Sequence, residues 1–223
     1  MPSLSEGKAT NLTRSLSALL WFASALCAQE PAQLSTPAPS PSTQAWDLSF
    51  ILDGYFVPDS VDYGSPVFSA DHNWLHLEAR YNYENLATGS LWAGYNFSWG
   101  KSLQFAVTPM FGVVFGRLNG VAPGCEASLT YKKLEASISN EYVIAPSDSS
   151  KNFYYSWPQL TYSATDWLRV GAVAQHTKAY HTPLSIQRGF LIGFNYEKWE
   201  TTVYVFNPGI TTPTVVLELG VSF

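Results

Sequence analysis

Charged residues are scarce in this sequence. Aspartate, glutamate, lysine and arginine make up 13% of its 223 residues, whereas 46% are hydrophobic and 15% are aromatic. An ordinary soluble domain carries about 25% charged residues, and it needs them to stay dispersed in water. The shortage favours a protein with part of its surface in a solvent that rejects charge.

Three further absences narrow the class. No run approaches the roughly 18 consecutive apolar residues of a spanning helix, so any membrane must be crossed by strands. The net charge is −5 without a basic patch, which predicts no nucleic-acid partner. Of the two cysteines, Cys27 lies in an apparent leader, so Cys125 has no partner for an internal disulfide.

The first 45 residues contain two non-globular segments. Residues 1–28 predict a secretory signal peptide, with basic residues, then an apolar run, then small residues for cleavage after Ala28. Cleavage near Ala25 and a lipoprotein reading through Cys27 are alternatives. Residues 29–45 are rich in proline, serine and threonine, which predicts a disordered linker. The folded domain is then expected over 46–223.

Residues 74–84 show an unbroken alternation of apolar and polar side chains. Leu75, Leu77, Ala79, Tyr81 and Tyr83 alternate with His76, Glu78, Arg80, Asn82 and Glu84. Successive side chains of a strand point to opposite faces, so one face here is apolar and the other is charged. A soluble barrel would bury the apolar face, whereas a transmembrane barrel turns it to lipid and keeps the polar face in its lumen.

The rest of the domain also has the pattern of strands and turns. We expect an all-β, antiparallel up-and-down transmembrane barrel of twelve strands, with ten as the alternative. The strands are expected near 46–57, 63–70, 74–84, 89–99, 102–115, 124–132, 134–144, 153–163, 167–177, 186–196, 199–207 and 214–223. Short turns alternate with longer connections such as 117–124, as in transmembrane barrels. Strand 63–70 contains Pro66, and it is retained because bacterial single-chain barrels have even strand numbers.

One rim of the barrel and the C-terminus carry further signals. Tryptophan concentrates at membrane boundaries, and an aromatic belt is predicted at one rim from Trp46, Trp74, Trp99, Trp167 and Trp199. The chain ends in an amphipathic strand whose apolar face includes Leu219, Val221 and Phe223. This end resembles the C-terminal signature of Gram-negative outer-membrane β-barrel proteins. The resemblance implies an outer-membrane location, lipid around the barrel and recognition of the last strand by the barrel assembly machinery.

If the apolar faces meet lipid, the opposite faces line the interior. The residues expected there are His76, Glu78, Arg80, Asn82, Glu84, Gln104, Glu126, Glu135, Glu141, Arg169, Gln187 and Glu218. This polar face suggests a narrow, porin-like channel for small polar solutes, in which Glu78, Arg80, Glu126, Glu135 and Arg169 set selectivity. The alternative is a closed structural barrel, filled by ion pairs, whose function lies in its loops. Strand number alone does not decide between them.

Two other classes have less support. An outer-membrane lipid hydrolase would need a serine beside an oriented histidine, and His176 and His181, expected near an outer loop, have no such serine; no catalytic residue is assigned. No metal site and no cofactor is predicted, because these histidines lack partners at ligand spacing. A secreted soluble barrel with an apolar interior is the last alternative.

Overall fold

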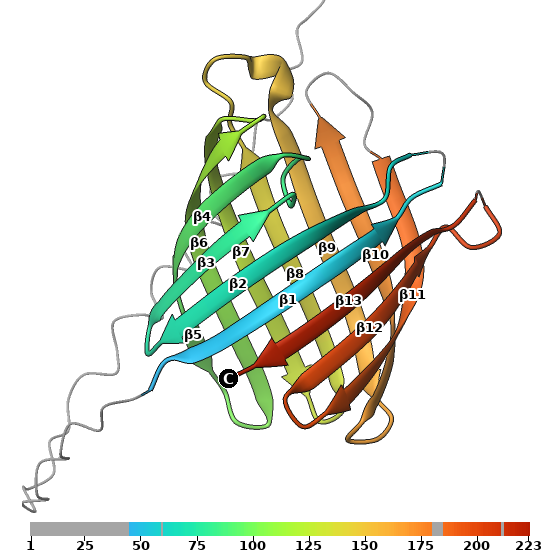
Figure 1. Ribbon diagram of the computed structural model, residues 1–223. Helices are drawn as coiled ribbons and strands as arrows, with labels where there is room; N and C mark the ends of the chain where they lie inside the picture. The colour runs from blue at the N-terminus through green and yellow to red at the C-terminus, as the bar shows by residue number, and fades with distance from the viewer. Residues whose placement is uncertain (1–44, 59, 180–184, 211) are drawn as a thin grey trace, which may run out of the picture. The chain divides into compact units, whose positions relative to one another are not determined.

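The folded domain is a closed antiparallel β-barrel. The computed structural model describes residues 45–58, 60–179, 185–210 and 212–223 (Figure 1). The predicted signal peptide and the linker up to residue 44 lie outside these residues and stay predictions. No helix in the described part of the chain is long and apolar enough to cross a membrane.

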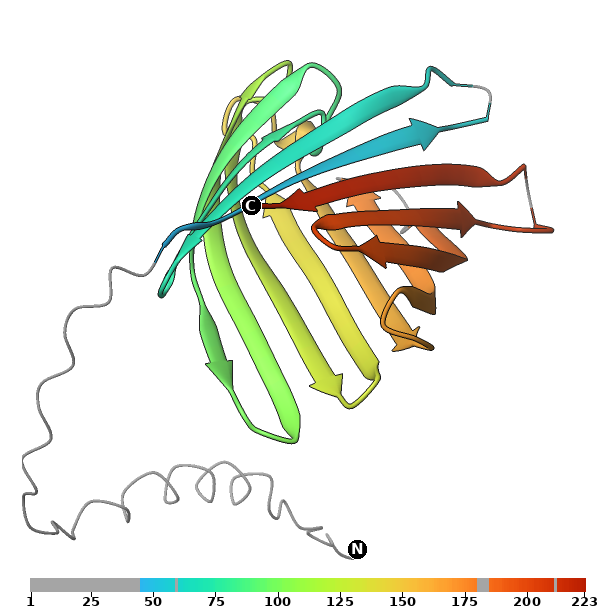
Figure 2. The ribbon, with the colours of Figure 1, turned by 60° about the horizontal axis from the view of Figure 1, so that its bottom comes forward.

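Thirteen strand segments form the barrel. They are β1 (Asp47–Phe56), β2 (Tyr63–His72), β3 (Leu75–Tyr81), β4 (Thr88–Tyr95), β5 (Phe97–Trp99), β6 (Leu103–Gly116), β7 (Gly120–Tyr131), β8 (Leu134–Val143), β9 (Phe153–Ser163), β10 (Leu168–Ala179), β11 (Ser185–Tyr196), β12 (Trp199–Phe206) and β13 (Thr214–Ser222). A short 3₁₀ helix, η1 (Ser149–Lys151), lies between β8 and β9. Strands that follow one another in the chain pair with each other, except that β4 and β5 both pair with β6, and β1 pairs with β13, which closes the ring (Figure 2).

The barrel has twelve strands, because β4 and β5 are two parts of one. Both pair with β6 in a single register, Gly94 with Met110 and Phe97 with Val107. Tyr95 therefore lies opposite Pro109, which has no N–H to give to the ladder. The missing donor explains the interruption, and the prediction of twelve strands is confirmed.

Two prolines lie within strands of the barrel. Strand β2 forms despite Pro66, which lies beyond the last β2–β3 pair, Val67 with Arg80. A longer connection was expected over 117–124, which contains Pro123, but this prediction was wrong, because β7 already begins at Gly120. Pro123 pairs with Phe111 of β6 but lies outside the continuous β7–β8 ladder, and a sheet accepts proline where one side of the residue is left out of a ladder.

The apolar faces of the strands point outward, as predicted. Along β3, His76, Glu78 and Arg80 are buried, whereas Leu77 is 36% exposed and Tyr81 49%. On β6, the outward set is Phe111, Val113 and Phe115, each about half exposed. Aromatic and aliphatic side chains exposed over a whole circumference are the lipid-facing surface of a membrane barrel. This arrangement is the reverse of a soluble barrel.

Part of the interior is apolar, which the alternation did not predict. One buried cluster, the Trp92 cluster, consists of Trp92, Met110, Val114, Leu118, Ala122, Val143 and Ala145. A second, the Trp157 cluster, consists of Trp157, Val173, Leu191, Tyr204, Phe206 and Val216. Both extend toward the end with the longer connections, drawn uppermost in Figure 1, because Leu118 and Ala145 lie in loops and Phe206 ends β12. Apolar side chains therefore fill part of the interior toward this end of the barrel.

Candidate functional site in the barrel interior

An ion network lies at the centre of the polar interior. Arg80 contacts three carboxylates: its guanidinium lies 2.5 Å from Glu78 Oε2, 3.2 Å from Glu141 Oε2 and 3.8 Å from Glu126 Oε1. The side chains of Arg80, Glu78 and Glu141 are all less than 10% exposed. The strand period positions Glu78 and Arg80 side by side, whereas Glu141 and Glu126 come from the distant strands β8 and β7.

Aromatic rings enclose the same guanidinium. Its central carbon lies 4.5 Å from the ring centroids of both Tyr83 and Trp92, and its Nη2 lies 3.5 Å from the sulfur of Met110. Cation–π contacts of this kind strengthen when water is excluded. Arg80 thus joins the carboxylate network to the apolar Trp92 cluster.

The segment after β3 departs from the predicted alternation. Asn82 has a φ of 58°, so the extended strand ends one residue before it. Tyr83, expected to face lipid, instead points inward and contacts the ring of Tyr155 edge-on at 5.8 Å. Asn82 was expected in the lumen, but its amide bonds to the backbone of Gly64 and Ala87. Both corrections have one cause, because a left-handed residue breaks the two-residue period of a strand.

Glu84 is buried in the interior, although it comes from the β3–β4 connection and not from a strand. Its Oε1 accepts hydrogen bonds from Ser90 Oγ at 2.5 Å and from Trp92 Nε1 at 3.2 Å. The indole of Trp92 lies flat against Gly112, where an added Cβ would come within 2.5 Å of the ring. Glycine at this position therefore allows the tryptophan to pack on the wall.

A chain of hydrogen bonds orients His76. Its Nδ1 lies 2.8 Å from Asp71 Oδ1, and the same oxygen accepts a 2.6 Å bond from Asn96 Nδ2. Thr108 in turn donates to Asn96 Oδ1 at 2.7 Å. The imidazole is thereby fixed, with Nε2 directed toward Glu78 Oε1 at a distance of 3.0 Å.

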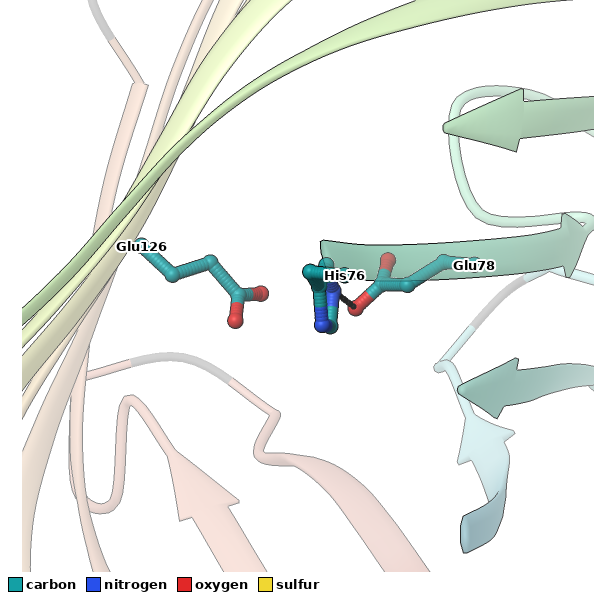
Figure 3. A group of neighbouring side chains, drawn as sticks. All are labelled: His76, Glu78 and Glu126. Carbon is teal, nitrogen blue, oxygen red and sulfur yellow. Dashed lines mark ion pairs between the residues drawn. The ribbon is translucent and has the colours of Figure 1, made fainter. Parts of the chain in front are cut away.

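Glu126 of β7 completes a group of three ligand-type side chains. One ligand atom each of His76, Glu78 and Glu126 lies within 4.8 Å of the others, and Figure 3 shows Glu126 extending toward the pair on β3. Sequence spacing did not reveal this group, because Glu126 lies far from His76 along the chain. The predicted histidine candidates differ: His176 lies within β10, and His181 lies outside the described residues.

A second ion network lies between β10, β12 and β13. Arg169 pairs with Glu200, lies 3.7 Å from Glu218 and donates to Thr202 Oγ1 at 2.6 Å. Tyr204 of the Trp157 cluster donates to Glu218 Oε2 at 3.0 Å. With the Arg169 and Glu200 side chains 24% and 39% exposed, this network is wetter than that of Arg80.

The remaining predicted interior residues lie apart from both networks. Gln104 borders a cavity near the turn end, and Glu135 is exposed there, accepting a 3.3 Å bond from Thr130. Gln187 is half-buried on β11. Asp53 and Asp71, which the sequence analysis did not select, line the central cavity. The two-residue period of β1 and β2, which places Asp53 and Asp71 on the interior face, was the signal in the sequence that could have found them.

The rim residues lie at strand ends beside short turns. Trp46, Trp74, Trp99, Trp167 and Trp199 are between 45% and 61% exposed. Several stack on neighbouring rings, such as Trp74 on Tyr95 at 5.1 Å. In the last strand, Leu219 is 44% exposed and Val221 is half-buried, and Phe223, which follows the strand directly, is 61% exposed. The role of this strand in assembly stays a prediction.

Comparison with known proteins identifies the fold. No family model and no curated protein matches the chain. A solved structure of the KdgM porin in complex with disordered oligogalacturonate is similar, with a TM-score of 0.55 and 14% identity over 79% of this chain and 98% of that chain. Another structure of the KdgM porin has a TM-score of 0.54 and 13% identity over 78% and 98%.

The chain has the fold of an outer-membrane porin. At such low identity, the likeness to the porins concerns the fold and transfers no ligand. The porin fold and the apolar exterior together locate this barrel in the outer membrane of a Gram-negative bacterium. The similar structures are porins and not enzymes.

Proposed function

We propose that the protein is a narrow outer-membrane channel for small polar solutes, with a preference for cations. The observation that carries this proposal is a series of cavities inside the barrel that share lining residues. An outer cavity of about 640 Å³ and a central cavity of about 260 Å³ share Tyr83 and Tyr155. The central cavity continues toward the turn end through a third, of about 200 Å³, with which it shares Glu126 and Ser139.

The constriction that we propose for this path is the pair of rings that lines both of the first two cavities. The rings of Tyr83 and Tyr155 are in edge-on contact, and Tyr83 lies in the connection that folds inward after β3. Tyr55 and Tyr155 also pack against the Trp157 cluster. A solute that moves from the outer cavity to the central one would pass beside the ring of Tyr83, which lines both.

Charge favours cations in the central cavity. The central cavity is lined by Asp53, Asp71, Glu78, Glu126 and Glu218, against a single guanidinium, Arg80, and the imidazole of His76. A ring of carboxylates attracts cations and repels anions. The same excess argues against transferring the polyanionic oligogalacturonate of the KdgM complex to this chain.

Planar-bilayer recordings test the proposal. The purified protein should give unitary conductance, and the reversal potential in a salt gradient should show cation preference. Tyr83→Ala should increase the conductance because it removes a ring from the proposed constriction. Tyr81→Ala is the matched control, since Tyr81 points outward and is 49% exposed.

One result would contradict the channel, and another would contradict its proposed constriction. Silence of both the wild type and Tyr83→Ala across a range of salts would mean that the buried networks seal the barrel, as in the closed structural alternative. An equal increase for Tyr81→Ala would mean that the Tyr83 contact does not control the path.

A further inference from the structure

We propose that His76, Glu78 and Glu126 bind a divalent transition-metal ion inside the barrel. Imidazole and carboxylate are ligands that zinc accepts in proteins, and three protein ligands with an open fourth position are typical of accessible zinc sites. Here the fourth position would face the central cavity, which the same three residues line.

The first argument is an unsatisfied nitrogen. His76 is 6% exposed, and among the described residues its Nε2 makes no hydrogen bond of acceptable geometry, although Glu78 Oε1 lies 3.0 Å away. Asp71 accepts from the other ring nitrogen, which leaves the lone pair of a neutral imidazole on Nε2. A neutral imidazole whose lone pair faces a carboxylate oxygen is repelled by it, and either a proton or a metal ion between the two atoms removes this repulsion.

The second argument is the way each ligand is supported. His76 is held through Nδ1 by Asp71, Glu78 through Oε2 by Arg80, and Glu126 through Oε1 by a 3.1 Å bond from Ser139. Each ligand therefore has one atom fixed by a neighbour and another free to bind. This division between a binding atom and a supported atom is characteristic of metal sites, where outer partners orient the ligands.

Charge leaves room for a divalent ion. Glu78, Glu126 and Glu141 lie around the guanidinium of Arg80, which contacts the Glu78 oxygen turned away from His76. Asp71 adds a fourth carboxylate on the other side of His76. With a neutral His76, these carboxylates exceed the guanidinium by three charges. A divalent cation offsets most of this excess, which a low-dielectric interior would otherwise leave uncompensated.

Isothermal titration of the detergent-solubilised protein with Zn²⁺ tests the site. The wild type should bind one ion per chain. His76→Gln and Glu126→Gln should weaken binding at least tenfold, and Asp71→Asn, which removes an orienting partner, should weaken it by about 10- to 100-fold. Glu135→Gln is the matched control, because this interior carboxylate bonds to Thr130 and does not touch the group.

The binding measurement is independent of channel activity, so it remains decisive for a barrel that does not conduct. Circular dichroism and cooperative thermal unfolding establish that each variant is folded, and Zn²⁺ should raise the melting temperature of the wild type. Anomalous scattering from zinc-soaked crystals of the wild type locates the ion without any substitution. Three results would each overturn the proposal: absence of saturable binding, unchanged affinity in folded His76→Gln and Glu126→Gln, or an ion bound elsewhere. If no saturable binding is found, a proton on Nε2 would take the place of the metal.

Discussion

Replacing Arg80 with methionine should strongly destabilise the barrel. The substitution keeps much of the side-chain volume but removes the positive charge that lies 2.5 Å from Glu78 and 3.2 Å from Glu141. Both carboxylate side chains are at most 6% exposed. Removing one partner of a buried ion pair costs about 3–5 kcal/mol, because the remaining charge loses its compensation without regaining water. We expect a loss of this size for Arg80→Met.

Equilibrium unfolding by urea in lipid vesicles, followed by tryptophan fluorescence, measures this loss. The double variant Arg80→Met/Glu141→Gln should be more stable than Arg80→Met, since it also removes a stranded charge. The control is Arg169→Met in the second network, where Arg169 is 24% exposed and its partner Glu200 39%. Solvent screens that pair, so its loss should cost roughly 1 kcal/mol or less.

The reasoning would be refuted if Arg80→Met unfolded within about 1 kcal/mol of the wild type, the range of a solvated ion pair. Such a result would mean that water enters the network freely enough to solvate Glu78 and Glu141. It would also weaken the argument that the group around His76 needs a metal ion. An equal cost for Arg169→Met would show that burial does not distinguish the two networks.

Two further substitutions test packing and orientation. Gly112→Ala should lower the free energy of unfolding by about 1–3 kcal/mol, because its Cβ would overlap the ring of Trp92. Gly54→Ala is the control and should change stability to urea less, because a Cβ at Gly54 has no contact closer than 3.7 Å. Equal losses for the two variants would contradict the packing. Phe111→Arg should lower the free energy of unfolding by up to about 2–4 kcal/mol, because it places a charge in lipid, whereas Gln104→Arg on the interior face should be tolerated. If unfolding in vesicles gave the reverse order, the assignment of the outer and inner faces would be wrong.

The order of strands follows largely from local sequence. Alternation along β3 identifies its two faces, and the scarcity of charge with an aromatic C-terminal strand identifies lipid as the outer solvent. Local patterns failed where a conformation or a ladder depended on a neighbour. Residues 117–124 were expected to form a loop, yet pairing with β6 keeps their second half in β7. Asn82 was expected in the lumen, yet its left-handed backbone directs its side chain to the backbone of Gly64 and Ala87.

The site was accessible to the sequence only in part. The period of two placed His76, Glu78 and Arg80 on one interior face before any coordinates, because successive strand side chains alternate. Which partners meet them depends on closure of the barrel, which brings Glu126 and Glu141 across from β7 and β8. The inward turn of Tyr83 is likewise a tertiary result. Sequence alone thus determined which faces of the strands are polar, whereas the curvature of the closed sheet decided which charged groups come into contact inside the barrel.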